Sequence, residues 1–290
     1  MIKKLTAGEL IKSFKKVMNE LRFKFGENWT RFLSVINDER ITMAEARLSE
    51  ALGNLRGKTF LDIGSGSGIH SLAAVRLGAS RVVSFDYDVK SVACSREMKR
   101  RFAPNADWAI SQGSALDANY LRSHGKFDIV YSWGVLHHTG DMWKALDMAT
   151  LPATEKLMVA IYNDQGWQSK AWTSLKARYN RSGNIGKRSI ELLTFLIQWG
   201  GISVYYTAKL KPLEPIRKWR NYSQVRGMSA WHDVVDWAGG YPFEVATPAQ
   251  IESFYKNRGF HLDWSKITKR SGCNEFVFKR NPTPLDEKPS

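Results

Sequence analysis

The chain has 290 residues, enough for one large α/β domain or two smaller ones, and its composition agrees with a soluble enzyme. Lysine and arginine outnumber aspartate and glutamate by 43 to 28, which gives a formal net charge of +15. Two cysteines, Cys94 and Cys273, exclude a disulfide framework and a cysteine-spaced metal site, so we expect no metal. The N-terminus lacks a long apolar core, which excludes a secretion signal and favours the cytoplasm.

Residues 1–50 are predicted to be helical. Leu10, Phe14 and Val17 recur three or four positions apart, which is the period of an amphipathic helix. The following stretch, residues 23–33, holds more aromatic residues than a plain amphipathic helix needs. We therefore expect Trp29 and Phe32 to be buried.

A predicted strand runs into a glycine-rich turn at residues 60–68, with the pattern Asp62-x-Gly64-x-Gly66-x-Gly68. Glycine is needed where a chain turns with positive φ, or where a ligand touches bare backbone. A helix is predicted to follow over residues 69–77, and a second apolar run over 81–85 ends in Asp86. An acid at the tip of the second strand of a βαβ unit is placed to accept hydrogen bonds from ribose hydroxyls.

The spacing of the glycines separates two classes of cofactor. A dinucleotide fingerprint reads G-x-G-x-x-G, whereas here the glycines alternate and Asp62 precedes the first of them by two residues. This pattern resembles motif I of the class I S-adenosylmethionine (SAM) methyltransferases, whose loop passes under the amino-acid end of the cofactor. The resemblance therefore implies SAM rather than a nicotinamide dinucleotide as the cofactor, with S-adenosylhomocysteine (SAH) as the product.

Further segments resemble this family in the same order. Residues 108–117 are similar to the third strand and its adenine-binding loop, although Ser114 stands where the family usually has an acid and Asp117 could substitute. Residues 126–138 resemble the fourth motif and residues 157–162 the fifth strand, while 247–255 and two later runs predict a last helix and a closing strand pair. The resemblance covers about residues 57–162 and 244–280, and it is nearest to the type 11/12 and ubiquinone-pathway O-methyltransferase group.

These segments predict an α/β fold of the Rossmann-like, doubly wound type. We expect a mainly parallel seven-stranded sheet with helices on both faces, an N-terminal helical cap and a helical insertion after the fifth strand. The predicted division is a cap over residues 1–50, a SAM-binding core over 51–162, a substrate lid over 163–243, the rest of the core over 244–280 and a disordered tail over 281–290. In related enzymes a helix before the core covers the cofactor, and plain packing on the core is the alternative.

The predicted insertion after the fifth strand is strongly basic. Residues 163–243 hold twelve lysines and arginines but five acids, so about half of the net charge of the chain falls within them, which indicates a phosphate or carboxylate substrate, a nucleic acid or an anionic membrane surface. A solvated lysine-rich face is the alternative. Residues 190–206 are apolar but too short and too interrupted to span a bilayer. They are predicted to form a lid helix packed on the core, and an interfacial membrane helix or an oligomer contact remain as alternatives.

The candidate site residues follow from these segments. Transfer to a hydroxyl is helped by a base, and histidine is the usual choice at neutral pH, so the catalytic candidates are His137, His138 and His232. His232 could pair with Asp236 one helical turn later. The expected cofactor-binding residues are Asp62, Gly64, Ser65, Gly66, Gly68, Asp86, Tyr87, Gly113, Ser114, Ala115, Ser132 and Trp133. The expected substrate-binding residues are Trp29, Tyr162, Asn163, Arg226, Trp231 and Asp233.

The sequence thus predicts a SAM-dependent methyltransferase that acts, most simply at oxygen, on a small or lipid-linked and anionic acceptor. Methylation of RNA by way of the basic insertion is one alternative, and a non-catalytic SAM- or SAH-binding protein is another. The expected setting is the cytoplasm, with peripheral contact at the inner membrane surface as a further interpretation. The oligomeric state is left open.

Overall fold

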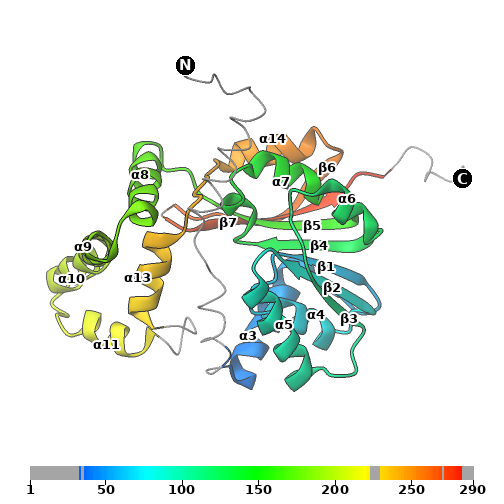
Figure 1. Cartoon of the computed structure of the whole chain (residues 1–290), viewed down its shortest axis with the longest axis horizontal. Helices are drawn as coiled ribbons and strands as arrows, with labels where there is room; N and C mark the ends of the chain where they lie inside the picture. The colour runs from blue at the N-terminus through cyan, green and yellow to red at the C-terminus, as the bar shows by residue number, and fades with distance from the viewer. Residues whose placement is uncertain (1–32, 34–35, 223–228, 270, 283–290) are drawn as a thin grey trace, which may run out of the picture. The chain divides into compact units, whose positions relative to one another are not determined.

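The structure is a computed structural model of the chain and describes residues 33, 36–222, 229–269 and 271–282 (Figure 1). The chain forms two compact units: a core unit of Phe25–Gly166 with Glu244–Ser290, and an insertion unit of Met1–Lys24 with Trp167–Phe243. The longer segment of the insertion unit, Trp167–Phe243, can be compared with the lid predicted over residues 163–243. It begins a few residues later and ends at the same residue. Trp29, Phe32 and Arg226, with most of the predicted cap and tail, lie outside the described residues.

The core unit is built on a seven-stranded sheet with the order β3-β2-β1-β4-β5-β7-β6. All neighbouring strands are parallel except β7, which runs antiparallel to both β5 and β6. This confirms the predicted mainly parallel sheet and its closing antiparallel pair. The strands are β1 Thr59–Ile63, β2 Arg81–Asp86, β3 Trp108–Gln112, β4 Phe127–Trp133, β5 Ala153–Tyr162, β6 Phe260–Lys266 and β7 Cys273–Arg280.

Alternate residues of the central strands face two separate hydrophobic clusters. Leu61 and Ile63 of β1 pack in one cluster, while Phe60, their neighbour on the strand, packs in the other. Side chains alternate across a strand, so a strand covered on both faces must be apolar at nearly every position. This is why β1, after Thr59, appears in the sequence as an apolar run that is interrupted by Asp62.

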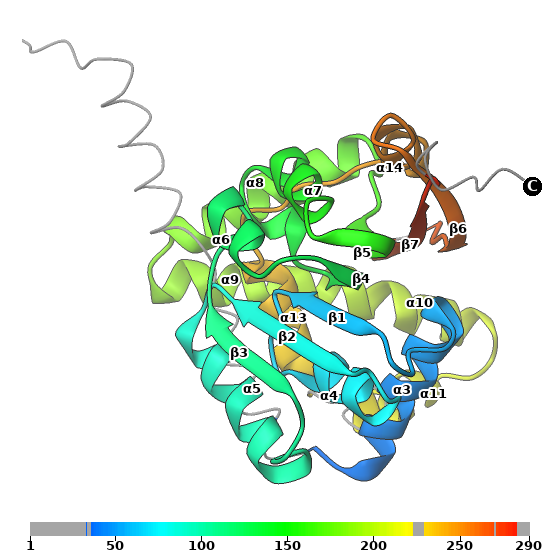
Figure 2. The ribbon, with the colours of Figure 1, turned by 90° about the vertical axis from the view of Figure 1, so that its right-hand side faces the viewer.

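Helices cover both faces of the sheet, as Figures 1 and 2 show. The helices on one face are α3 Asp38–Leu52, α4 Ile69–Arg76 and α5 Val89–Phe102; those on the other are α6 Ala118–Ser123, α7 Met142–Ala149 and α14 Pro248–Lys256. Helix α3 was expected as part of a cap, but it packs its apolar stripe, including Ile41 and Leu48, into the core beside α4. Helix α14 begins at the predicted position, with Thr247 and Gln250 forming a capping box.

The insertion unit is helical. Its helices are α8 Trp167–Arg181, α9 Asn184–Phe195, the π-helical turn η2 Leu196–Gly200, α10 Gly201–Ala208, α11 Glu214–Arg220 and α13 Ala230–Gly239. Because Phe195, Gly200 and Gly201 all have helical backbone angles, α9, η2 and α10 form one continuous helix. Helix α13 packs against α8 and α9 through two small clusters centred on Ala238 and Val234. None of the helices in the described part of the chain combines the length and the apolar character that crossing a bilayer demands.

Candidate functional site

The glycine-rich turn lies between β1 and α4, at the carboxyl edge of the parallel strands. Gly64, Gly66 and Gly68 all adopt positive φ, at 79°, 53° and 81°. A Cβ atom on Gly64 would lie 2.4 Å from a methyl group of Val135, and one on Gly68 would lie 2.8 Å from the hydroxyl of Ser95. Both the backbone conformation and the close neighbours therefore require glycine at these positions.

Hydrogen bonds join this turn to the end of β2. The amides of Gly64 and Ser65 donate to the carbonyl oxygen of Phe85 at 2.8 and 3.0 Å. The amide of Gly66 donates to one carboxylate oxygen of Asp86 at 2.9 Å, and the amide of Asp88 donates to the other at the same distance. The acid that was predicted to bind ribose is therefore held in a fixed orientation beside the glycine backbone.

Asp62 is the other acid of the motif, and it is buried at the end of β1. Burial raises the pKa of the Asp62 carboxyl to about 7, while the Ser71 hydroxyl, which donates to it at 2.6 Å, opposes that shift. A buried carboxylate is costly unless a cation or several donors accompany it. Asp62 therefore favours a cationic group on any ligand that reaches it.

The loop after β3 follows the prediction in position but uses its polar groups internally. The amide of Gly113 donates to the Asp86 carbonyl at 3.0 Å, and the Ser114 hydroxyl accepts from the Leu116 amide at 3.2 Å. Asp117, the suggested substitute for the missing acid, caps helix α6 by accepting from the amides of residues 119 and 120. Ala115, in the same loop, is buried.

The end of β4 brings Ser132 and Trp133 to the same edge of the sheet. The Ser132 hydroxyl is fully buried and donates to the Ile63 carbonyl at 2.9 Å, so it ties β4 to β1. Trp133 is 40% exposed, and its indole N–H donates to Glu275 at 3.1 Å. His70, in the first turn of α4, lies against Trp133 with ring centroids 6.1 Å apart.

His70 was missed by the sequence analysis, although its place directly after the glycine motif was a usable signal. Part of its side chain is exposed, yet burial among its neighbours lowers the pKa of the His70 imidazole to about 4, and the Arg47 guanidinium adds to this shift. The ring is therefore neutral at physiological pH.

His137 and His138 lie together in the short 3₁₀ helix η1, Leu136–His138, and both contact Tyr162 at the end of β5. The centroid of the Tyr162 ring lies 4.1 Å from that of His137 and 5.5 Å from that of His138. His137 is fully buried, whereas His138 is 6% exposed. The structure thus brings three of the predicted residues into one cluster.

A second residue that the sequence analysis missed, Glu244, supports this cluster from a distant part of the chain. Its amide donates to the His137 carbonyl at 3.0 Å, and its carboxylate accepts from the amides of Gly140 and Met142 at 3.0 and 3.1 Å. Burial raises the pKa of the Glu244 carboxyl. No local sequence pattern predicts this role of Glu244, because the amides that its carboxylate binds are about a hundred positions earlier in the sequence.

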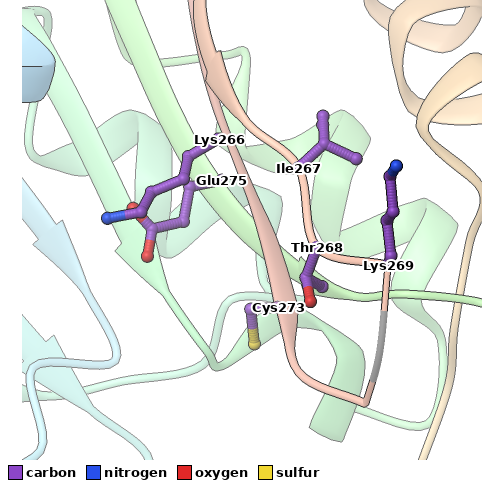
Figure 3. A pocket seen from close by; sticks show the side chains of 6 residues that line it. All are labelled: Lys266, Ile267, Thr268, Lys269, Cys273 and Glu275. Atoms are coloured by element: carbon purple, nitrogen blue, oxygen red, sulfur yellow. The ribbon is translucent and has the colours of Figure 1, made fainter.

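Asn163 directly follows β5, where a substrate contact was predicted. Its side-chain amide donates to the Thr268 carbonyl at 3.3 Å and accepts from Asn274 at 3.1 Å, so it fastens the β6–β7 hairpin. A pocket of about 450 Å³ opens beside this hairpin, lined by Lys266, Ile267, Thr268, Lys269, Cys273 and Glu275. In Figure 3, Lys266 and Glu275, which are paired in register, lie on one side of the pocket. The pocket includes none of the glycine turn.

The remaining predicted residues belong to the insertion unit. His232, in the first turn of α13, has its Nδ1 atom 2.6 Å from the hydroxyl of Ser229, the N-cap residue. Asp233 accepts from the Tyr222 hydroxyl at 2.7 Å, and the Trp231 ring lies 6.2 Å from that of Phe195. The pairing of His232 with Asp236 stays a prediction.

Comparisons with known protein sequences match the part of the core unit that carries the glycine turn and Asp86. The family profile described as Ribosomal protein L11 methyltransferase (PrmA) matches residues 44–133. The ribosomal protein L11 methyltransferase of Tolumonas auensis is 46% identical over 48 residues, which are 17% of this chain and 16% of that protein. The corresponding protein of Xanthomonas oryzae is 41% identical over 58 residues, 20% of this chain and 18% of that protein. The match therefore spans less than a fifth of the length of these relatives.

Solved structures share the fold over most of the chain. Magnesium protoporphyrin IX methyltransferase from Synechocystis PCC 6803 with bound SAH has a TM-score of 0.50 at 16% identity, covering 84% of this chain and 83% of that one. PKMT2 from Rickettsia typhi in complex with AdoHcy has a TM-score of 0.55 at 13% identity, covering 84% and 54%. The family profile and the sheet order therefore agree with the predicted resemblance to the class I SAM-dependent methyltransferases, and the solved structures show that the fold is shared.

Proposed function

We propose that this protein transfers the methyl group of SAM to an acceptor. The observation that carries the proposal is the join between the glycine turn and Asp86, in which the Gly66 amide donates to the Asp86 carboxylate at 2.9 Å. This hydrogen bond holds bare backbone and the acid that we propose for ribose side by side at the carboxyl edge of β1 and β2, where open α/β sheets bind ligands. The positive φ angles and close neighbours of Gly64 and Gly68 keep side chains out of that space.

The residues at this edge fit SAM in chemical character. Asp62 would face the cationic amino group, the backbone of the glycine turn the amino-acid end, and Asp86 the ribose hydroxyls. Gly113, Ser114, Ala115 and the exposed ring of Tyr87 would hold the adenine, with Trp133 as a wall. When bound, SAM supplies an activated methyl group on its sulfonium. The protein contributes orientation, because the acceptor atom must lie close to the methyl carbon and in line with its bond to sulfur.

For an oxygen acceptor, we propose His138 as the general base. Of the two adjacent histidines it is the one with exposed surface, while His137 is fully buried against Tyr162 and acts as its support. A neutral imidazole at His138 would take the proton of the acceptor hydroxyl as methyl transfer proceeds. His232 remains the alternative base from the insertion unit.

The acceptor we propose is small or lipid-linked and anionic, because twelve lysines and arginines but only four acids lie between Trp167 and Phe243. A protein or RNA acceptor is the second candidate, and the match to ribosomal protein L11 methyltransferases favours it. That match ends at residue 133, before the histidine cluster and the insertion unit begin, so it concerns the part of the chain proposed to bind the donor.

Calorimetric titration with SAH tests the donor site. Wild-type protein should bind SAH, and Asp86→Asn should weaken binding about tenfold to a hundredfold, because a charge-assisted hydrogen bond is lost. Asp107→Asn is the matched control, since Asp107 is an exposed acid that precedes β3 and should leave SAH affinity unchanged. If wild-type protein does not bind SAH, the methyltransferase proposal fails.

Incubation with methyl-labelled SAM and separated lipid, RNA and protein fractions of a cell extract tests the acceptor. Label in the lipid or small-molecule fraction supports the first candidate, and label in RNA or protein replaces it with the second. In the labelled fraction, His138→Ala should lower the rate about 10²- to 10⁴-fold and leave SAH affinity intact. Equal loss of rate and SAH affinity would instead make His138 a structural residue, and His232→Ala would become the next test of the base.

A further inference from the structure

The continuous helix formed by α9, η2 and α10 presents a long apolar stripe to solvent. Most of the exposed side chains come in adjacent pairs, at residues 192 and 193, 196 and 197, and 204 and 205, one or two helical turns apart, and Val204 is 71% exposed. The other side packs inward through Ile190, Thr194 and Trp199. The exposed members of the stripe are Ile185, Leu192, Leu193, Leu196, Ile197, Val204 and Tyr205.

Charge is kept off this stripe. Glu191 is the only charged residue between Arg188 and Lys209, and its side chain is only 6% exposed. It accepts hydrogen bonds from the Tyr179 hydroxyl and from Arg188, both at 2.8 Å. An acid placed here would normally stay in water, because burial of a carboxylate costs energy that only partners offset. Turning it inward leaves the outer side of the helix without a negative charge.

Cations lie at both ends of the stripe. Lys187 and Arg188 lie at its start, between Ile185 and Leu192, and Lys209 and Lys211 follow it, with further basic residues on α11. Across residues 184–222 the basic side chains are Lys187, Arg188, Lys209, Lys211, Arg217, Lys218 and Arg220, while Glu191 and Glu214 are the only acids. Leu210 and Leu213, between the cations of this second group, are also exposed, at 91% and 69%.

We propose that this surface, defined by the outer side of residues 184–213, lies on an anionic phospholipid bilayer. An apolar helix face flanked by lysine and arginine is the pattern of an interfacial helix, whose apolar side enters the boundary between headgroups and acyl chains. The flanking cations then meet the negative surface of the leaflet. Tyr205 is suited to the interface, since its ring is apolar and its hydroxyl polar.

Charge decides between a bilayer and the other partners of an apolar face. A second copy of this chain, related by two-fold symmetry, would bring the same basic flanks against each other. A nucleic acid would satisfy the cations but would leave seven aliphatic and aromatic side chains of the stripe against phosphate and sugar. A bilayer alone offers an apolar layer under an anionic one. The inference concerns where the protein works and does not depend on the proposed methyl transfer.

Flotation of the full-length protein with vesicles tests this inference. Wild-type protein should float with vesicles of phosphatidylcholine and phosphatidylglycerol, more weakly with phosphatidylcholine alone, and less as salt is raised. Leu196→Gln with Ile197→Gln should reduce binding at least about tenfold, because two apolar side chains no longer enter the bilayer. The matched control is Met43→Gln with Leu262→Gln, two exposed apolar residues of the core unit, which should bind like wild type.

The electrostatic part is tested by Lys209→Ala with Lys211→Ala. Each lysine at an anionic surface contributes about fivefold in binding, so removing the pair should lower affinity for phosphatidylglycerol vesicles about twenty-fivefold. Lys144→Ala with Lys256→Ala removes the same charge from exposed positions in the core unit and should change binding little.

Several outcomes would overturn the inference. These are no flotation of the wild type, equal loss in target and control variants, or a change from dimer to monomer in Leu196→Gln with Ile197→Gln without any vesicle binding. Retention of tRNA that depends on the lysine pair, with vesicles left unbound, would assign the surface to nucleic acid. SAH affinity measured on the same samples distinguishes the two proposals. Vesicle binding can fail while SAH binding stays intact, and SAH binding can fail while vesicle binding stays intact.

Discussion

The core unit and the insertion unit use their apolar residues in different ways. In the core unit, two large clusters on the two faces of the sheet absorb nearly every apolar side chain of the central strands. In the insertion unit, the two clusters have only three buried members each. Among the described residues, eleven of the eighteen large hydrophobic side chains that stay exposed lie between Trp167 and Phe243.

This difference in apolar burial separates residues that stabilise the fold from residues that are available to bind a partner. A doubly wound sheet buries its own apolar surface, so the core unit needs no partner to satisfy its hydrophobic residues. Soluble proteins rarely leave large contiguous apolar patches exposed without an interaction that covers them. The exposed apolar residues of the insertion unit are therefore best explained by a partner that covers them. The apolar residues of the core unit are explained by folding, and its glycine turn by the cofactor.

The largest expected contrast comes from a leucine in each unit. Leu61→Ala should lower the free energy of unfolding by about 2–5 kcal/mol, because Leu61 is fully buried in the sheet and its loss leaves a cavity. Leu196→Ala should change it by less than about 0.5 kcal/mol, since that side chain is 55% exposed. Urea denaturation in the absence of lipid measures both. A large loss from Leu196→Ala would show that the stripe is part of a folded interface and not a free surface.

A smaller effect is expected from Lys176, a charged residue buried within the insertion unit. Its ammonium group donates to the Trp237 carbonyl and lies 4.3 Å from the Trp237 ring centroid. Burial lowers the pKa of the Lys176 ammonium to about 7, and the Asp236 carboxylate opposes that shift. Because the unfolded chain keeps the usual value near 10.5, it binds more protons between these pH values, and stability rises as pH increases from about 7 to 10.5.

Lys176→Met should therefore raise the free energy of unfolding of the insertion unit by about 1–4 kcal/mol at neutral pH and remove this pH dependence. The lower end of this range allows for the loss of the cation–π contacts that the ammonium group makes. Hydrogen exchange of the α8 and α13 amides, followed against pH, measures it. Lys170→Met changes an exposed lysine of the same helix and should have little effect. Destabilisation by Lys176→Met at every pH would mean that the hydrogen bond to Trp237 outweighs the cost of burial.

Much of the core unit could be predicted because its signals are local. The glycine turn, the end of the second strand at Asp86 and the start of the last helix at Thr247 each show in a short stretch of sequence, and each is found where it was predicted. Glu244 and the hydroxyl of Ser132 could not be assigned in this way. Their roles depend on contacts with Gly140 and Ile63, which neighbour them only after the sheet has formed. The apolar character of residues 190–206 could be read from the sequence, but which of their side chains face outward could be known only from the packing of the helix.

A moderate effect is expected from Asp62, which links the fold of the core unit to ligand binding. Its carboxyl has a pKa raised to about 7 by burial, so the free protein binds more protons than the unfolded chain between about 3.8 and 7. The free protein should therefore lose stability as pH rises through this range, the reverse of an ion-paired acid. SAH carries a cationic amino group that favours ionised Asp62. Affinity for SAH should thus fall by up to about tenfold for each pH unit below 7, and calorimetry across this range measures it.

The control for this prediction is Asp62→Asn, which keeps a hydrogen-bond acceptor for Ser71 but cannot ionise. It should bind SAH weakly at every pH and show a flat profile. If wild-type protein and Asp62→Asn share the same pH dependence, another group titrates, and Asp62 is a structural acid of the core.

The smallest expected effect returns to glycine, whose role differs between the two units. Gly64 in the core has positive φ and no room for a side chain, whereas Gly201 in the insertion unit has helical angles, φ −60° and ψ −41°, and nothing within 4 Å of a Cβ. Gly201→Ala should therefore stabilise the helix by about 0.5–1 kcal/mol, measured by thermal unfolding, because alanine loses less backbone entropy. Gly64→Ala should destabilise the core and abolish SAH binding. Destabilisation by Gly201→Ala would instead indicate that the helix must bend at this point, next to the π-helical turn, to place its apolar stripe.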